Sequence, residues 1–283
     1  MANMRAIRNR IKSIESTRQI TRSMRMVAAA KLMKAQDAWQ RLEDYASVSR
    51  EVLRRLSAAL GETDEPLLRG RGEGPTCFVL LLGNRGLCGA YHTALLKYAQ
   101  ERAGSEKDAF LAVCGRWGRE QTAALGLPVK RRFELSDVPE AEEARSIADW
   151  LKEQFLSGEA GRVVLLFERY QSALTQEPGE LPLLPLAAAE AAGEKQTILF
   201  EPDAETLLRR LAEQVLTNTV RAALLEAKTG EHTARMTAMA AASDNTEELI
   251  ARLSMDLNHA RQAAITTEIT EIVSGSNALK QQG

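Results

Sequence analysis

Glycine and proline are absent from the first 60 residues of this 283-residue chain and scarce in residues 204–283. The segment between them, residues 61–203, holds all 8 prolines and 15 of the 18 glycines. In a helix interior Gly costs about 1 kcal/mol and Pro about 3 kcal/mol relative to Ala. Both ends therefore predict long helices, over residues 1–60 and 204–283. At about 1.5 Å per residue these would measure on the order of 85 and 110 Å, too long to fit inside one compact domain.

Apolar residues in the first segment follow an alternating spacing of four and three, which is the heptad seam of a left-handed coiled coil. The ladder, with 12 of 16 positions apolar, is Ile7, Ile11, Ile14, Arg18, Thr21, Arg25, Ala28, Leu32, Ala35, Trp39, Leu42, Ala46, Ser49, Leu53, Leu56 and Leu60. The last segment repeats the spacing less regularly, at Leu207, Leu211, Val215, Met236, Met239, Leu249, Leu253, Leu257, Ile265, Ile269 and Ile272. Two such helices can cover each other only if the middle turns the chain around. The pattern predicts an antiparallel coiled coil with a domain inserted at one end.

The middle segment alternates short apolar runs with helical patterns, which is typical of a parallel sheet with helical crossovers. The expected strands are Cys77–Leu82, Ala109–Val113, Val129–Phe133 and Val163–Phe167, and the expected helices cover residues 90–103, 116–125 and 140–156. Ser172–Leu186 contains three prolines, which suits an edge strand or an irregular return. The predicted fold class is α/β, with a Rossmann-like domain at residues 74–200 between the two coiled-coil helices.

The net charge of the whole chain is close to zero, but the three segments differ strongly in net charge. Lys and Arg number 37 against 38 Asp and Glu, but residues 1–60 carry a net charge of +8, residues 61–203 carry −7 and residues 204–283 carry −2. A basic helix is either a solvated stripe or a surface for an acidic partner. Nucleic acid is the weaker alternative, because the helix lacks interleaved aromatic residues. An acidic protein surface is the better candidate.

No segment reaches the roughly 18 consecutive apolar residues that a membrane span needs, and the N-terminus has no apolar run behind its positive charges. Cys77, Cys88 and Cys114 are too few for a disulfide framework and are interpreted as free thiols. We expect a soluble protein that is not exported.

The sequence GNRGLCG at Gly83–Gly89 lies between an expected strand and an expected helix, where glycines can let a phosphate approach the backbone. Its G-x-x-G-x-x-G spacing is neither the dinucleotide fingerprint nor a triphosphate loop, so a tight structural turn is the simpler interpretation. Cys88 is a candidate thiolate of lowered pKa, but only His92 stands near it and no catalytic set is complete. His232 and His259 are too far apart for a metal site, and we expect them to be solvated or to face a partner. The pattern predicts no catalytic residue, no metal site and no cofactor.

Three blocks resemble the gamma subunit of F-type ATP synthases, the central rotor shaft. They are IRNRIKSIESTRQITRSMRMVAAAKLMKAQ at Ile7–Gln36, NRGLCGAYH at Asn84–His92, and ARMTAMAAASDN with NHARQAAITTEITEIVSGSNAL within Ala234–Leu279. Asn84 occupies a place where many members have Asp. The alternatives are a Rossmann-type nucleotide enzyme with helical arms, which tight nucleotide binding would reveal, and a coiled-coil nucleic-acid-binding protein, which salt-dependent binding would reveal.

The resemblance implies a non-catalytic subunit whose coiled coil stands inside a ring of three alpha and three beta subunits, with catalysis on beta. It also implies an α/β domain bound to epsilon and to the membrane ring of c subunits, at the cytoplasmic face of a bacterial membrane. Matched to the family, Arg261, Gln262, Thr266 and Glu268 are expected to contact the beta subunits. Arg85 and Lys97 are expected to meet acidic loops of beta.

Overall fold

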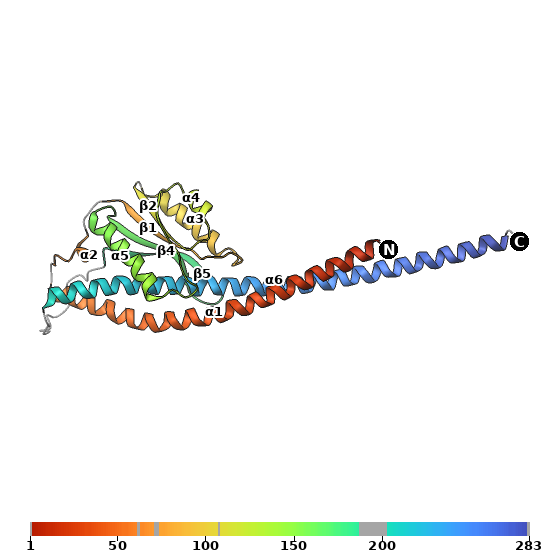
Figure 1. The fold of residues 1–283 in the computed structure, drawn as a ribbon, viewed down its shortest axis with the longest axis horizontal. Helices are drawn as coiled ribbons and strands as arrows, with labels where there is room; N and C mark the ends of the chain where they lie inside the picture. Colours follow the sequence, from red (N-terminus) through yellow and green to blue (C-terminus); the bar gives the residue numbers. More distant parts are fainter. Residues whose placement is uncertain (1, 61–62, 71–73, 107, 187–202, 282–283) are drawn as a thin grey trace. The chain divides into compact units, whose positions relative to one another are not determined.

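The computed structural model describes residues 2–60, 63–70, 74–106, 108–186 and 203–281 (Figure 1). Its two longest elements are α1 (Ala2–Leu60) and α6 (Ala204–Gln281), as the distribution of Gly and Pro predicts. The chain forms two compact units, and each unit contains one part of α1 and one part of α6. Unit 1 comprises Met1–Val27 with Met236–Gly283, and unit 2 comprises Ala28–Arg235. Residues 187–200 of the predicted α/β domain lie outside the described residues.

Unit 1 is a pair of antiparallel helical segments. The Arg22 guanidinium lies 3.4 Å from the Glu247 carboxylate across the pair, and α6 extends past the beginning of α1 (Figure 1). Because no part of α1 lies opposite the end of α6, Ile265, Ile269 and Ile272 are exposed. These three residues therefore do not form the buried seam that the spacing predicts.

The predicted seam of α1 is confirmed at every position except Arg25, which is exposed while the neighbouring Met24 is half-buried. A slip of one residue also occurs in α6, where Leu249 is exposed and Ile250 is half-buried. In that stretch of α6 the buried positions are Ser243 and Thr246. An ideal α-helix drifts relative to a strict heptad, so the seam moves by one residue where small or polar side chains impose no apolar contact.

Unit 2 contains a five-stranded sheet in the order β3-β2-β1-β4-β5. Its strands are β1 (Thr76–Leu81), β2 (Ala109–Cys114), β3 (Val129–Phe133), β4 (Arg162–Tyr170) and β5 (Gln176–Leu184). The first four are parallel, as predicted, and β5 pairs antiparallel with β4 at the edge of the sheet. An edge position tolerates Pro178 and Pro182 because the outer side of the strand needs no backbone donor.

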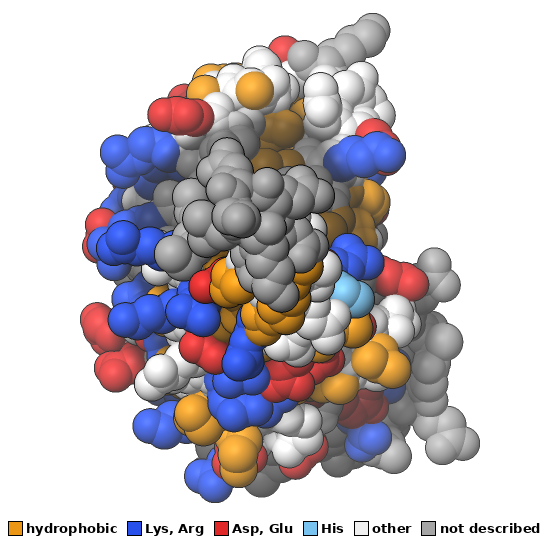
Figure 2. Space-filling model, turned by 90° about the vertical axis from the view of Figure 1, so that its right-hand side faces the viewer, with side chains coloured by type: hydrophobic (Ala, Val, Ile, Leu, Met, Phe, Trp, Pro, Cys, Tyr) orange, Lys and Arg blue, Asp and Glu red, His pale blue; other side chains and the backbone are white. Residues whose placement is uncertain are grey.

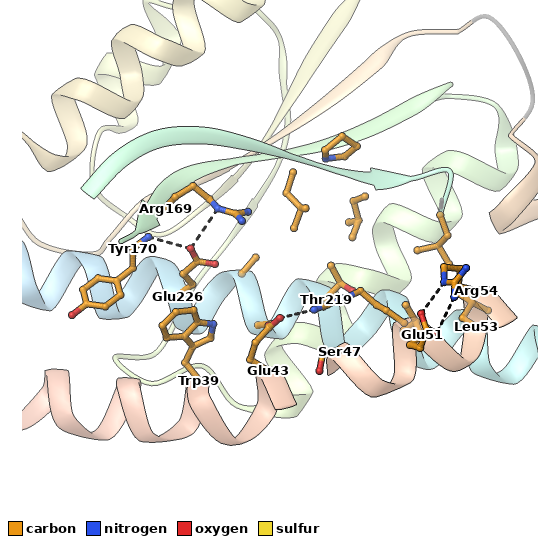
Figure 3. Close-up of a pocket in the computed structure, with 18 of the residues that line it drawn as sticks. Trp39, Glu43, Ser47, Glu51, Leu53, Arg54, Arg169, Tyr170, Thr219 and Glu226 are labelled. Atoms are coloured by element: carbon orange, nitrogen blue, oxygen red, sulfur yellow. Dashed lines mark hydrogen bonds and ion pairs between the residues drawn. The ribbon is translucent and has the colours of Figure 1, made fainter. Parts of the chain in front are cut away.

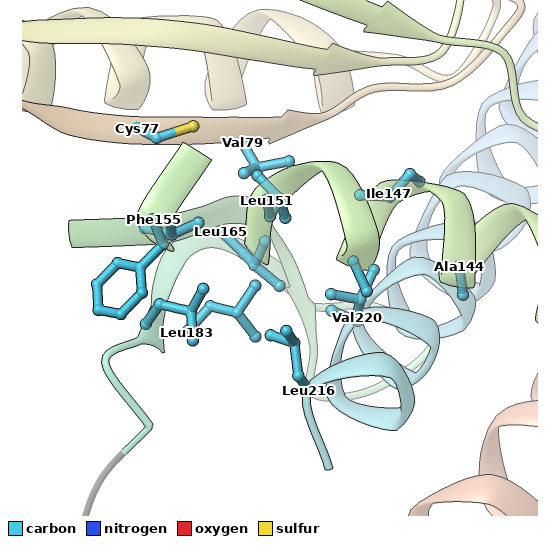
Figure 4. Packing of buried hydrophobic residues seen from close by; sticks show 14 of the residues in the cluster. Cys77, Val79, Ala144, Ile147, Leu151, Phe155, Leu165, Leu183, Leu216 and Val220 are labelled. Carbon is cyan, nitrogen blue, oxygen red and sulfur yellow. The ribbon is translucent and has the colours of Figure 1, made fainter. Parts of the chain in front are cut away.

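Helices cover both faces of this sheet. On one face α3 (Tyr91–Gly104) packs through Leu95 and Ala99 onto alternate residues of β1, among them Phe78 and Leu80. On the other face α5 (Ala141–Ser157) lies between the sheet and α6 (Figure 4). Its apolar residues, spaced three and four apart, contact both layers; they are Ala144, Ile147, Ala148, Leu151 and Phe155.

Two shorter helices complete unit 2. The first, α2 (Pro66–Arg69), begins at a proline and buries Leu67 and Leu68 in the same core as α5. The second, α4 (Arg119–Ala123), is shorter than the predicted helix over 116–125. Gly118 and Gly126 flank it with φ of +73° and +75°, so the backbone leaves the right-handed helical region on both sides.

Candidate functional site

A cluster of charged residues is buried on α6 where unit 2 ends. Glu231 is 3% exposed and accepts hydrogen bonds from Lys228 Nζ at 2.8 Å and from Arg235 Nη2 at 2.7 Å. The spacing of three and four residues places all three side chains on one face of the helix. A buried carboxylate with two cationic partners satisfies the rule that charges enter an interior only when paired.

The charge state of Glu231 follows from these partners. Burial alone would raise its pKa, but the charges and hydrogen bonds of Lys228 and Arg235 outweigh burial and lower the pKa to about 2. The carboxylate is therefore ionised throughout the physiological range.

The cluster holds the loop that follows β1, residues Gly83–Gly89, which we call the Arg85 loop. Arg235 donates from Nη2 to the Arg85 carbonyl at 2.9 Å and from Nε to the Gly86 carbonyl at 3.2 Å. A Cβ at Gly83 would come within 2.4 Å of the Glu231 carboxyl carbon, so the loop can lie this close to the cluster only with glycine there. Its carbonyl groups face protein donors, which supports the interpretation of GNRGLCG as a structural turn.

Asn84 fixes the other side of the Arg85 loop. Its Nδ2 donates to the Leu135 carbonyl, and its Oδ1 accepts from the backbone N–H of Arg116 at 3.2 Å. An ionised Asp has no donor for the Leu135 carbonyl, so the Asn in this chain uses a capability that Asp lacks.

Two histidines in this region are buried, and burial lowers the pKa of both. His232, 1% exposed, is not solvated or partner-facing as the sequence suggested, because it packs between Arg235 and the segment before α5. Arg235 can only donate, so His232 Nδ1 accepts and Nε2 donates to the Asp137 carbonyl at 3.3 Å. His92 Nε2 likewise donates to the Arg85 carbonyl at 3.2 Å. Both rings are neutral and structural.

The structure does not support the lowered pKa that was considered for Cys88. It is 3% exposed, and burial raises its pKa above the ordinary value of a thiol. Cys77 and Cys114 lie deeper, within the sheet, and are free thiols like Cys88.

The structure leaves the six predicted contact residues exposed. Arg85 lies in the loop after β1 and Lys97 on α3, both in unit 2. The other four lie on the part of α6 that belongs to unit 1; they are Arg261, Gln262, Thr266 and Glu268. Among them the Thr266 hydroxyl donates to the Gln262 carbonyl at 3.0 Å, a bond within the helix that leaves the Gln262 side chain available.

An apolar residue in the Arg85 loop was missed by the sequence reasoning. Leu87 has a φ of +61° and is 63% exposed, although left-handed backbone is costly for a residue with a branched side chain. Exposed apolar side chains are interspersed with acidic and basic ones on the face seen in Figure 2. Leu87 differs from ordinary surface residues because its backbone is held in a strained conformation.

The charged cluster was also missed, together with an ion pair that reaches it from α1. Lys31 Nζ lies 2.6 Å from the Asp137 carboxylate, and this hydrogen bond lowers the pKa of Asp137. The signal for the cluster was present in the sequence, as opposite charges at i, i+3 and i+4 in Lys228, Glu231 and Arg235. Such a pattern is common on exposed helices, so only the fold shows that it is buried.

A pocket of about 930 Å³ lies between α1, the β4–β5 pair and α6 in unit 2 (Figure 3). Its charged residues neutralise one another in pairs, Arg50 with Glu43, Arg54 with Glu51, and Arg169 with Glu226. The lining residues contain neither cysteine nor histidine. Within the described ranges, no three His, Cys, Asp or Glu residues are grouped so as to hold a metal ion. The lining combines apolar side chains with ion-paired charged groups, among them Glu226, whose pKa is raised by burial.

Glu168 on β4 is another buried carboxyl group, 1% exposed, and its Oε1 has no hydrogen-bond partner among the described residues. Burial, helped by the nearby charge of Glu177, raises its pKa from 4.5 to about 7. Because the pKa of Glu168 is higher in the folded state, its contribution to the free energy of unfolding is fully present below pH 4.5. This contribution is lost as the pH rises towards 7.

We therefore predict a pH-dependent effect of Glu168→Gln. From pH 4.5 to pH 8 the variant should gain stability relative to the wild type by up to about 3 kcal/mol, because a tenfold change in proton affinity corresponds to about 1.36 kcal/mol. Urea titrations of both proteins at the two pH values measure the difference. A stability difference that does not change with pH would mean that Glu168 has an ordinary pKa.

No helix among the described residues is long and apolar enough to cross a membrane.

Comparison with known proteins gives the same architecture and a family. A solved chain from the Euglena gracilis mitochondrial ATP synthase, in a structure of its OSCP, F1 and c-ring, matches with a TM-score of 0.69 at 17% identity, covering 98% of this chain and 95% of that one. A chain from the Tetrahymena thermophila mitochondrial ATP synthase central stalk and c-ring matches with a TM-score of 0.61 at 21% identity, covering 79% of this chain and 99% of that one. At these identities the structures show a shared fold.

The sequence comparisons are more specific. The ATP synthase gamma chain of Desulforamulus reducens is 38% identical over 99% of this chain and 100% of its own length. That of Moorella thermoacetica is 40% identical over the same shares of the two chains. A family model described as ATP synthase matches residues 3–279. This chain therefore belongs to the ATP synthase gamma chain family.

Proposed function

We propose that the chain is the non-catalytic rotor of an ATP synthase, and that it transmits torque between a proton-driven ring of c subunits and the catalytic beta subunits. The observation that carries this proposal is the exposed polar surface of α6 in unit 1. Arg261 and Gln262 are exposed beside the half-buried Leu257, Ala260 and Ala264. Because their neighbours are small or half-buried, these two long polar side chains are free to reach a surrounding ring of alpha and beta subunits.

Weak polar contacts suit a rotor better than a large dry interface. An exposed ion pair contributes about 0.2 to 1 kcal/mol, so each contact can be released as the shaft turns. Because the faces of the coiled coil differ, each of the three beta subunits would contact a different set of side chains. These different contacts would shift the conformational equilibrium of each beta subunit differently. Arg261, Gln262, Thr266 and Glu268 would act on beta in this way, with Arg85 and Lys97 meeting acidic beta loops.

The remaining partners follow from the same proposal. The α/β domain, with proposed limits 74–200 between helices 1–60 and 204–283, would bind epsilon and the c-ring. The protein would thereby be peripheral to the membrane, at the cytoplasmic face of a bacterial cell. Relatives named as gamma chains, and a solved neighbour titled as central stalk and c-ring, support the assignment to a central stalk beside a c-ring.

Substituting Arg261 and Gln262 together by Ala tests the proposal. Alanine slightly raises helix propensity, so circular dichroism of the free chain should be unchanged. In the assembled complex, single-molecule rotation should show altered torque and dwell times, because the beta subunits lose two polar contacts. Arg252→Ala, on the same helix and also exposed, is the matched control. Unchanged stepping in the double variant would mean that these residues are only solvated helix surface.

A further inference from the structure

The Arg85 loop is held by side chains from other parts of the fold. The Arg85 carbonyl uses both of its acceptor positions, one for Arg235 Nη2 at 2.9 Å and one for His92 Nε2 at 3.2 Å. The next carbonyl, of Gly86, accepts from Arg235 Nε at 3.2 Å. One buried guanidinium thus binds two consecutive peptide groups of a loop whose Arg85 and Leu87 are exposed.

The loop needs such restraint because its next residue is strained. Leu87 adopts a φ of +61°, which L-residues other than Gly, Asn and Asp rarely adopt. Its side chain is exposed, so burial of that side chain does not compensate for the strain. Strain of this kind persists only where surrounding contacts enforce the conformation. The hydrogen bonds to Arg85 and Gly86 are the contacts immediately before it.

We propose that Arg235 is a positioning residue for partner binding. Glu231 orients its guanidinium, and the guanidinium fixes the Arg85 loop in the shape that presents the charge of Arg85 and the apolar side chain of Leu87 side by side to a partner surface. The inference rests on the proposed contact of Arg85 with an acidic loop of the beta subunit. It adds Leu87 to that contact, and it makes a buried residue of α6 responsible for its geometry.

Arginine is required because four groups surround its planar head. Besides the two loop carbonyls, it contacts Glu231 Oε1 at 2.7 Å and His232 Nδ1 at 3.2 Å. A lysine ammonium keeps the positive charge for Glu231 but is a compact group on a flexible stem, and it cannot span these positions together. Arg235→Lys therefore preserves the charge balance and removes the hydrogen bonds that fix the Arg85 loop.

Cys88 provides a direct readout of the loop, because it is buried at its end. In the full-length chain, we expect Arg235→Lys to increase the rate of Cys88 modification by N-ethylmaleimide about tenfold or more, as expected for loss of one charge-assisted hydrogen bond. Cys77 and Cys114, buried in the sheet, should react as slowly as before. Arg210→Lys, the same change at an exposed position of α6, is the control.

An unchanged rate at Cys88 would overturn the inference, since the loop would then hold its shape without Arg235. An equal acceleration at all three cysteines would also overturn it, because the variant would be loosening the whole domain. Only selective exposure of Cys88 supports a local positioning role.

The assembled complex separates this inference from the proposed function. Arg85→Ala and Arg235→Lys should each lower ATP synthesis per complex, and the double variant should lose no more than the stronger single variant, because both act on one contact. Losses that multiply would overturn the positioning role. If Arg85→Ala has no effect while Cys88 becomes exposed in Arg235→Lys, the loop is positioned as inferred and the proposed beta contact of Arg85 is wrong.

Discussion

Glu231→Gln should lower the free energy of unfolding of unit 2 by about 3 to 5 kcal/mol, the usual cost of removing one partner from a buried ion pair. The substitution is nearly isosteric, so it leaves no cavity. It leaves the Lys228 and Arg235 side chains, 3% and 10% exposed, without the carboxylate that compensates for their burial. Domains of this size have total stabilities of about 5 to 15 kcal/mol, so the loss is a large fraction of the whole.

Tryptophan fluorescence during urea unfolding measures this loss of stability in unit 2. All three tryptophans, Trp39, Trp117 and Trp150, lie in unit 2, so their signal reports this unit. Glu213→Gln is the matched control. Glu213 lies on α6 like Glu231 and pairs with Lys152 of α5 at 3.0 Å, but its side chain is half exposed. That variant should lose no more than about 1 kcal/mol. Equal stabilities for the two variants would contradict the role assigned to the buried cluster.

Arg85→Glu should leave the stability of the free subunit intact and impair rotor-driven ATP synthesis in the complex. Arg85 is exposed, so the free subunit should melt within a few degrees of the wild type. In the complex the reversal would turn the proposed attraction between Arg85 and acidic beta loops into a repulsion. Twice the value of an exposed ion pair is about 0.4 to 2 kcal/mol, which corresponds to a loss of roughly 2-fold to 30-fold in rotor-driven ATP synthesis.

The control for Arg85→Glu is Arg145→Glu, an identical charge reversal at an exposed position of α5. It should leave synthesis per assembled complex unchanged. A collapse in the melting temperature of Arg85→Glu with synthesis intact would reverse the assignment, because Arg85 would then be a structural residue.

The long elements could be predicted because their determinants are local. The absence of Gly and Pro in the first segment and their scarcity in the last, together with the heptad spacing, are enough to specify α1 and α6. Short apolar runs between helical patterns are enough to specify β1 to β4. The exact seam could not be predicted at Arg25 or Leu249. There the choice between neighbouring residues depends on which side chain the opposite helix presents, and that information is not local.

The buried cluster shows a second limit of sequence reasoning. Lys228, Glu231, His232 and Arg235 have the composition of a solvated helix face, and His232 was expected on such a surface. They are buried because the Arg85 loop and the segment around Asp137 fold over α6. The raised pKa of Cys88 could not be predicted for the same reason, since it depends on burial rather than on the place of Cys88 before a helix.

The exposed contact residues are a third case. The structure shows that Arg261, Gln262, Thr266, Glu268, Arg85 and Lys97 are accessible, and the physical properties of each are those of ordinary surface residues. The contact role proposed for them rests on the family resemblance, because a partner's surface is encoded in a different chain. The gamma chain family itself was predictable from three sequence blocks, and the comparisons confirm it.

The most direct test of the rotor role is to watch the chain move. The alpha and beta subunits would be fixed to a surface, with a probe attached to an introduced cysteine on this chain, and ATP would be added. The account predicts rotation in one direction with pauses three times per turn, because in the proposed complex three beta subunits would act in turn on this chain. A chain that stays fixed relative to beta while ATP is hydrolysed at the normal rate would contradict it.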